Sequence, residues 1–287
     1  MTNQEVYLLS NRDHNESQRL DMQHEVLAGF MGYELLHPSI DIRVHDGLNI
    51  ADVGTGTGIW LKRLLSWSKY LPGAPSYYLN GFDISSDQFP VEPGDINFTI
   101  HDITTPFPSE HLGRYDVVHL RLFVLALPES DIIKALTNVI GLLRPTGYLQ
   151  WEDADFCYTA PDRPAAKITE VIDLVSIYMA RTGLSLRLSD ILIKEGTRLG
   201  LQELRKYNYS TLTNPDHYED IQIWFNQLCY AILPVILQRS GQAGNEADSK
   251  SMAARILTDM QSAYCDGAVP ELRIFTVVGK RNIEGRS

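Results

Sequence analysis

The stretch Ile50-Ala51-Asp52-Val53-Gly54-Thr55-Gly56-Thr57-Gly58 decides the fold of this 287-residue chain. It begins with a short apolar run that carries one acid, a pattern typical of a buried strand. Three glycines follow at alternate positions, and residues 60–67 then carry leucines at helical spacing. We therefore expect a strand-to-helix turn, where glycine lets a ligand approach the backbone and the helix start offers unpaired N–H groups.

The spacing of these glycines limits which ligand the turn can hold. A dinucleotide-binding turn needs glycines at its first, third and sixth positions, and the sixth position here is Ile59. A phosphate-binding loop is also excluded, because no Gly-Lys-Ser/Thr triplet follows. Asp52 would repel a pyrophosphate, but it suits a ligand that carries an ammonium and a sulfonium group. The plain alternative is a flexible turn that binds nothing.

Four more strands are expected before residue 155, and polar residues stand at or just after the end of each. The strands are expected over 77–84, 96–100, 115–121 and 147–152, and the last follows a helix over 131–143 and the stop signal 144–147. This alternation predicts an α/β fold with a parallel sheet. Ligands of such sheets bind outside the carboxyl ends of the strands. Downstream we expect helices over 161–182, 185–200, 216–239 and 245–263, and strands over 201–212 and 271–278.

Two further carboxylates are expected at this edge of the sheet. Asp83 closes the second strand and could accept hydrogen bonds from both hydroxyls of a ribose, unless it is an ordinary turn or helix-cap aspartate. Asp102 follows the third strand and, without a ligand, would be a surface-loop residue. His119 and Arg121 leave the fourth strand at the same edge, so topology alone places them near the site.

These motifs resemble the class I methyltransferases that use S-adenosylmethionine (SAM). Asp-x-Gly-x-Gly-x-Gly over 52–58 is the form that this family shows, and in the family the acid at the position of Asp102 bonds the adenine amino group. The likeness is most specific to the fungal SAM-dependent methyltransferases of secondary metabolism, which include toxin-cluster enzymes and relatives of a global regulator. Segments that support it are 7–9, 16–33, 37–39, 81–85, 117–121, 147–151 and 264–270.

The resemblance implies a Rossmann-like fold with a central, mostly parallel seven-stranded sheet, helices on both faces, an N-terminal helical lid and helical insertions. It implies one domain over residues 1–282. Within it we expect the lid in 1–46, the SAM-binding core in 47–155, helical substrate-side insertions and a sixth strand in 156–270, and a closing strand in 271–280. Residues 283–287 include Ile-Glu-Gly-Arg, a protease-site linker of expression vectors, and are left out of the fold.

The same resemblance supplies the expected cofactor contacts. Tyr7 and the helix that bears Gln23 and His24 would close over the cofactor, which is compatible with a helix simply packed on the sheet. The residues expected to bind SAM, or its product S-adenosylhomocysteine (SAH), are Tyr7, Asp52, Gly54, Thr55, Gly56, Gly58, Asp83, Ile84, Asp102, Ile103, His119 and Leu120.

The implied chemistry is an in-line attack by a nucleophile on the sulfonium methyl group, which the protein promotes by positioning. A hydroxyl acceptor would also need a general base within hydrogen-bond reach. The alternative for each candidate base is a structural role, and for Arg121 it is an ion pair with Glu152 or Asp153. The candidate bases are His119, which leads on topology, Glu152, His24, His101 and Asp153.

Composition is that of an ordinary soluble protein, with 44% hydrophobic and 21% charged residues. We find neither an apolar stretch of membrane-spanning length nor a signal sequence. The net charge of −11 disfavours nucleic acid as a partner. Three cysteines without a close pair indicate a reducing compartment, so we expect a cytoplasmic protein. No metal site is expected, and the sequence carries no signature that decides for or against a homodimer.

Three functions are compatible with these motifs. The preferred one is methyl transfer to an oxygen or nitrogen of a fungal secondary metabolite. The second is a SAM-binding enzyme of this fold that catalyses dehydration or pericyclisation, and the third is a regulatory interaction protein. The expected acceptor is an apolar or aromatic small molecule. Side chains that would surround it, or that pack in the core, are Tyr158, Tyr178, Met179, Tyr218, Trp224, Phe225 and Tyr230.

Overall fold

The computed structural model describes residues 8, 12–41, 47–68, 77–156 and 166–282. Tyr7, Tyr158 and the linker at 283–287, all named above, lie outside the described residues. The expected alternation of strands and helices holds only in part within the described residues. Helices separate the first strand from the second and the fourth from the fifth, whereas the second strand leads to the third without a helix and only a 3-10 turn precedes the fourth; two strands and four α-helices follow the fifth strand.

One sheet of seven strands runs through the described part of the chain, in the order β3-β2-β1-β4-β5-β7-β6. Neighbours from β3 to β5 pair in parallel, whereas β7 is antiparallel to both β5 and β6. The prediction of an α/β fold with a mostly parallel seven-stranded sheet is confirmed. The strands are β1 (Leu48–Val53), β2 (Tyr77–Asp83), β3 (Ile96–Ile100), β4 (Tyr115–Arg121), β5 (Leu143–Asp155), β6 (Leu201–Ser210) and β7 (Arg273–Arg281).

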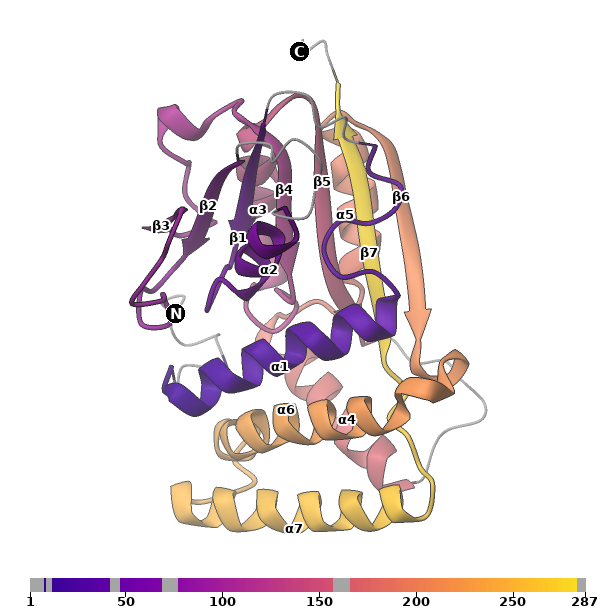
Figure 1. The fold of residues 1–287 in the computed structure, drawn as a ribbon. Helices are drawn as coiled ribbons and strands as arrows, with labels where there is room; N and C mark the ends of the chain where they lie inside the picture. Colours follow the sequence, from indigo (N-terminus) through magenta and orange to yellow (C-terminus); the bar gives the residue numbers. More distant parts are fainter. Residues whose placement is uncertain (1–7, 9–11, 42–46, 69–76, 157–165, 283–287) are drawn as a thin grey trace.

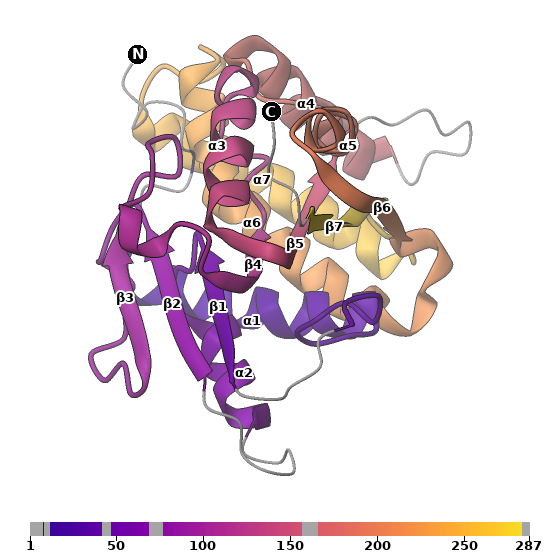
Figure 2. The ribbon, with the colours of Figure 1, turned by 90° about the horizontal axis from the view of Figure 1, so that it is seen from above.

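Helices cover both faces of the sheet and one of its ends. Figure 2 shows α2 (Ile59–Ser68) on one face, with α3 (Glu129–Leu142) and α5 (Leu188–Arg198) on the other. In Figure 1, α1 (His14–Met31), α6 (Tyr218–Arg239) and α7 (Glu246–Cys265) form successive layers beneath the sheet, with α4 (Ala166–Thr182) beside them. Short 3-10 turns lie at Ser109–His111, Thr211–Thr213 and Pro215–His217.

The layer beneath the sheet has its own apolar core. Phe30 of α1, Trp224 and Phe225 of α6 and Met260 of α7 belong to one buried cluster. The expectation that no apolar stretch reaches membrane-spanning length is wrong for one segment, because Pro215–Arg239 is long and apolar enough by length and composition alone. In the folded protein, 44% of its most apolar window is buried. α6 packs between α1 and α7, and most of its buried residues belong to this core.

The start of β5 differs from the expectation. The predicted strand begins after the stop signal at 144–147, whereas β5 begins at Leu143, directly after α3. Leu143 is already extended, with φ −67° and ψ 135°, and it pairs with Tyr115 of β4. The register shifts between Tyr115 and Val117, and Thr146 takes a left-handed φ of 68°. The stop signal therefore ends the helix but lies inside an irregular strand.

Candidate active site

The glycine turn has the geometry that its sequence predicts. Gly54, Gly56 and Gly58 have φ values of 72°, 52° and 72°, a region that residues with a Cβ rarely adopt. A Cβ on Gly54 would lie 2.5 Å from the Phe123 ring, so the close approach also requires glycine there. The amides of Gly54 and Thr55 donate to the Phe82 carbonyl, which fixes the turn against the end of β2.

Two of the predicted cofactor carboxylates lie at the ends of neighbouring strands. Asp83 accepts a hydrogen bond from the Gly56 amide at 2.9 Å, and its other oxygen lies 3.3 Å from Nη1 of Arg12. Asp102 accepts from the amide and the hydroxyl of Thr104, which forms the turn after β3. Carboxylates in these two places fit the ribose and the adenine of a nucleoside laid across the strand ends.

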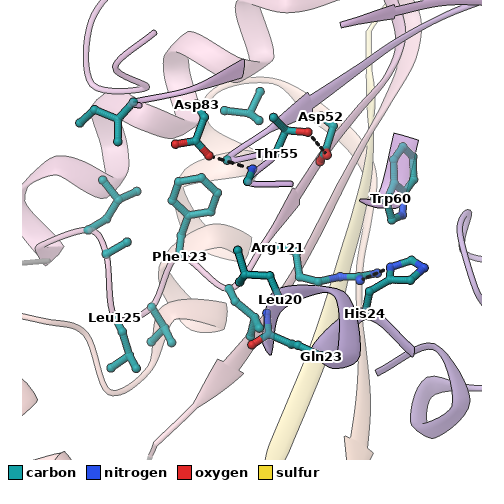
Figure 3. Close-up of a pocket in the computed structure, with 18 of the residues that line it drawn as sticks. Leu20, Gln23, His24, Asp52, Thr55, Trp60, Asp83, Arg121, Phe123 and Leu125 are labelled. Atoms are coloured by element: carbon teal, nitrogen blue, oxygen red, sulfur yellow. Dashed lines mark hydrogen bonds between the residues drawn. The ribbon is translucent and has the colours of Figure 1, made fainter. Parts of the chain in front are cut away.

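A cavity of about 460 Å³ lies between this edge of the sheet and the layer of α1 and α6. This is within the usual range for small-molecule sites. Figure 3 shows Asp83, Thr55 and Asp52 on one side, with Leu20, Gln23 and His24 of α1 facing them. Of the predicted cofactor residues, those that line the cavity are Asp52, Gly54, Thr55, Gly56, Asp83, Ile84, Asp102, Ile103 and His119.

Two predicted cofactor residues do not line the cavity. Leu120 is fully buried inside the sheet, and Gly58 faces the ring of Phe98 on the far side of the turn. Gly58 still supports the site indirectly, because a Cβ there would lie 2.6 Å from that ring. A direct contact of either residue with the cofactor stays a prediction.

Strand register brings the predicted catalytic groups into one buried network. Asp52 stands opposite His119 across β1 and β4, and Arg121 stands opposite Glu152 across β4 and β5. The His119 Nδ1 lies 2.8 Å from Asp52, and its Nε2 lies 3.4 Å from Glu152. Nε of Arg121 donates to Glu152 at 2.5 Å, and Nη1 donates to Nδ1 of His24 at 3.0 Å.

The network shifts the protonation of its members. Burial alone would raise the pKa of Glu152, but Arg121 and His119 outweigh it and lower this pKa to about 2. Burial alone would lower the pKa of His119, but hydrogen bonds and charge from Asp52 and Glu152 raise it above its ordinary value. Burial, with Arg121 and His119 adding to it, lowers the pKa of His24 to about 3. Glu152 is therefore ionised and His24 neutral near neutral pH.

These contacts bear on the predicted bases. Glu152 also accepts from Tyr33 at 2.9 Å and from Gln150 at 2.6 Å, so its oxygens already have several donors. Both ring nitrogens of His119 face carboxylates, and the lone pair of His24 accepts from Arg121. A catalytic role for any of the three stays a prediction, and each has a structural role as well. The expected ion pair between Arg121 and Glu152 is present.

The described side chains that were expected around the acceptor separate into three groups. Trp224 and Phe225 line the cavity, together with Leu228, on the face of α6 that points to the sheet. Tyr178 and Met179 of α4 are buried in the core instead. Tyr218 and Tyr230 are not among the lining residues, and Tyr230 is 72% exposed. The apolar part of the cavity wall comes from α6 and from residues at or beside the ends of β5 and β7.

Several lining residues were not predicted from the sequence. Phe123 covers Gly54, Leu20 lies against Gly56, and Trp60 stacks on His119 at a centroid distance of 4.1 Å and an angle of 4°. Phe123 comes two residues after the end of β4, a strand that ends in the polar residue Arg121, and this is the signal that could have indicated it. Nothing in the sequence pattern distinguishes Leu20 from the other apolar residues of α1.

Asp153 holds the loop that carries Phe123. Its carboxylate accepts from the amides of Phe123, Val124 and Ala154 at 2.7, 3.2 and 2.9 Å, and from Nε1 of Trp151 at 3.0 Å. Burial raises the pKa of Asp153 to about 7, against the opposing effect of these donors. Asp153 therefore acts as a positioning residue for a cavity wall, and its expected role as a base stays a prediction.

Replacing Asp153 by asparagine should weaken both stability and SAM binding. The amide keeps one acceptor but turns an N–H₂ group toward backbone N–H donors, which should cost about 1–3 kcal/mol of unfolding free energy. SAM affinity, measured by calorimetry where both proteins are folded, should fall several-fold as the loop shifts. Asp155→Asn is the matched control, since Asp155 binds Ser189 and Lys206 and does not line the cavity. Equal SAM affinity in the two variants would contradict the positioning role.

No group of three or more His, Cys, Asp or Glu side chains that could hold a metal ion occurs within the described residues. The donor set of the cavity fits SAM instead. It offers a glycine turn open to close approach, a carboxylate at the end of β2 and another after β3.

Comparison with known proteins agrees with this geometry. No family model matches the chain. The chain is 34% identical over 262 residues to methyltransferase grgD of a Penicillium species, which covers 89% of this chain and 90% of that protein. It is 31% identical over 160 residues to N-methyltransferase gliN of Aspergillus fumigatus, over 55% and 53% of the two chains.

Two solved structures show the same fold. Haemonchus contortus phosphoethanolamine N-methyltransferase 2, in complex with SAM, matches 92% of this chain and 52% of its own with a TM-score of 0.53 and 11% identity. The [4+2]-cyclase SpnF matches 93% of this chain and 96% of its own with a TM-score of 0.51 and 14% identity. The chain therefore belongs to the class I SAM-dependent methyltransferases of fungal secondary metabolism.

Proposed function

We propose that the chain methylates an oxygen or nitrogen of a small apolar or aromatic metabolite. The observation that supports this most directly is the division of the cavity into two chemically different walls. The glycine turn, Asp83 and Asp102 form a polar wall, whereas α6 and β7 supply an apolar one. The apolar wall includes Trp224, Phe225, Leu228, Leu272 and Ile274. A polar methyl donor, SAM, on one side and an apolar methyl acceptor on the other fit this division.

The residues of this chain would act mainly by positioning. When bound, SAM supplies a methyl group on a sulfonium, which is electrophilic without further activation. The glycine turn and the strand ends would hold SAM, the methyl donor. The apolar face of α6 would hold the acceptor next to SAM and exclude water. α1 touches both sides through Leu20 and Gln23, so it would link donor and acceptor binding.

The hydrogen bonds of the buried network favour an acceptor that reacts without help from a general base. The oxygens of Glu152 and both ring nitrogens of His119 contact neighbouring polar groups, and the lone pair on Nδ1 of His24 accepts from Arg121. An amine nitrogen, or an acidic oxygen that is already ionised, does not require removal of a proton before attack. The names of four relatives, the N-methyltransferases gliN, sirN, tcpN and verN, support nitrogen.

The same proposal places the protein in the cytoplasm, with a soluble small molecule as its partner. A net charge of −11 supports the exclusion of nucleic acid, because binding to phosphates depends on basic surfaces. The packing of α6 into the core supports the exclusion of a membrane partner.

The test is a product analysis. Purified protein would be incubated with methyl-deuterated SAM and each available intermediate of its own gene cluster, and SAH and product masses would be followed by mass spectrometry. Gain of one labelled methyl group, matched by SAH, is the expected result. Loss of water, or conversion without a change of mass, would favour the dehydration or pericyclisation alternative instead. A chain that binds SAM but converts nothing would support the regulatory alternative.

A further inference from the structure

One end of the cavity carries buried N–H groups without hydrogen-bond partners. Among the described side chains that line the cavity, four atoms are buried and unpartnered. They are Nε2 of His24, Nε1 of Trp60, Nη2 of Arg121 and Nε2 of Gln88. No oxygen of a described lining side chain is in this state. The polar side-chain atoms of this wall that lack a partner are therefore nitrogens, which can donate hydrogen bonds to a ligand.

The tautomer of His24 follows from its contact with Arg121. A guanidinium has only donors, so Nη1 of Arg121 donates and Nδ1 of His24 accepts at 3.0 Å. A neutral imidazole then carries its hydrogen on Nε2, which makes that atom a donor. The buried position of His24, 1% exposed, and the positive charge beside it keep the ring neutral.

Three of these donors come from different elements and lie at the same end of the cavity. Figure 3 shows Trp60 of α2 next to His24 of α1, with the Arg121 guanidinium extending from β4 toward His24 and away from Asp83. Each group is held in place by another contact. Trp60 is stacked on His119, and Arg121 is bound to Glu152 and to His24.

A buried donor without a partner is costly, so three together require an explanation. The nearby carboxylates of Asp52 and Glu152 do not supply it, because neither makes a hydrogen bond to any of these three atoms. We propose that His24, Trp60 and Arg121 form a subsite that binds a carboxylate group of a ligand. A carboxylate has only acceptors, and its charge complements the guanidinium.

This inference rests on the proposed function, which offers two sources for the carboxylate. One is the amino-acid end of SAM. The strand order β3-β2-β1-β4 places Asp102, Asp83, the glycine turn and Arg121 in sequence, so a cofactor laid along them would end at the subsite. The other source is an acidic acceptor that enters from the apolar side. Either source would present a carboxylate to the N–H groups of His24, Trp60 and Arg121.

The first arm of the test compares SAM with decarboxylated SAM, which keeps the sulfonium and the amine. If the cofactor fills the subsite, calorimetry should show that the wild-type protein binds SAM about tenfold to a hundredfold more tightly than the decarboxylated form. Trp60→Phe removes one donor but keeps the ring stacked on His119. It should lose much of this preference, about tenfold, without weaker binding of decarboxylated SAM.

Two further variants distinguish loss of the subsite from a folding defect. Arg121→Lys keeps a positive charge beside Glu152 but lacks Nη2, so it should reduce the same preference while the protein stays folded by circular dichroism. Trp67→Phe is the matched control, because Trp67 lies on the same helix and is 45% exposed. It should behave as the wild-type protein does.

The second arm tests an acidic acceptor. With SAH present, 2-naphthoate and its neutral counterpart 2-naphthamide would be titrated into the same four proteins. If the acceptor fills the subsite, only the acid should bind, and Trp60→Phe and Arg121→Lys should weaken its binding about tenfold.

If SAM binds but neither arm shows a preference for a carboxylate, the subsite is wrong and the proposed function stands. If SAM does not bind, the proposed function is wrong, and the naphthoate titration without SAH decides the subsite.

Discussion

Replacing Gly56 by arginine should abolish SAM binding, with an affinity loss of at least about a hundredfold. Gly56 has a φ of 52° and donates its amide to Asp83 at 2.9 Å. A Cβ there would lie 3.1 Å from Leu20 of α1, so a long side chain would have to extend into the cavity. Its guanidinium would also lie near Asp83, the carboxylate expected to accept the ribose hydroxyls. Calorimetry with SAM and with SAH measures the loss directly.

The control for this substitution is Gly94→Arg. Gly94 has a φ of 60° and an exposed position, and a Cβ there would meet nothing within 4 Å. The two variants therefore share the added charge and the strained backbone, and they differ only in their place. Gly94→Arg should bind SAM as the wild-type protein does. Unaltered SAM affinity in Gly56→Arg would overturn the assignment of the cofactor site.

The parts of the site that sequence could predict are those set by local pattern and by topology. A glycine run between a buried strand and a helix fixes a turn, and parallel strands end at one edge of the sheet. Asp83, Asp102 and Arg121 were therefore expected near one another, and all three line the cavity. The burial of Asp52 under the turn follows from the same local pattern.

The pairing of side chains could not be predicted in this way. Whether Asp52 meets His119 depends on the register of β1 against β4, and a shift of one residue would turn His119 to the other face. The contact between His24 and Arg121 joins residues 97 positions apart, through the docking angle of α1. For this reason the sequence could offer His24 as a candidate base but could not indicate that Nδ1 of its ring accepts from Arg121.

Replacing Glu152 by glutamine should destabilise the protein by about 3 kcal/mol, or lower its melting temperature by roughly 5 °C. The amide has the shape of the acid but removes the charge that compensates Arg121 and His119, and Glu152 is 1% exposed. A buried charge that loses its partner is costly. Glu170→Gln is the matched control, because the ion pair of Glu170 with Lys167 is exposed, and it should change stability by less than about 0.5 kcal/mol.

The dependence of stability on pH should separate loss of this charge from a mere packing defect. The pKa of Glu152 is lowered to about 2 in the folded protein, so its contribution is present above its unfolded pKa of 4.5 and is lost as the pH falls toward 2. The pKa of His119 is raised, so its contribution to stability is present below pH 6.5 and is lost as the pH rises through the folded pKa.

Urea unfolding between about pH 3 and pH 8 should therefore give the wild-type protein its maximum stability between the unfolded pKa values of these two groups, 4.5 and 6.5. In Glu152→Gln the decline on the acid side should become shallower, and the decline on the alkaline side should become smaller and end at a lower pH, because His119 has lost a carboxylate that raises its pKa. Parallel curves for the two proteins would show that Glu152 does not hold its charge in this network.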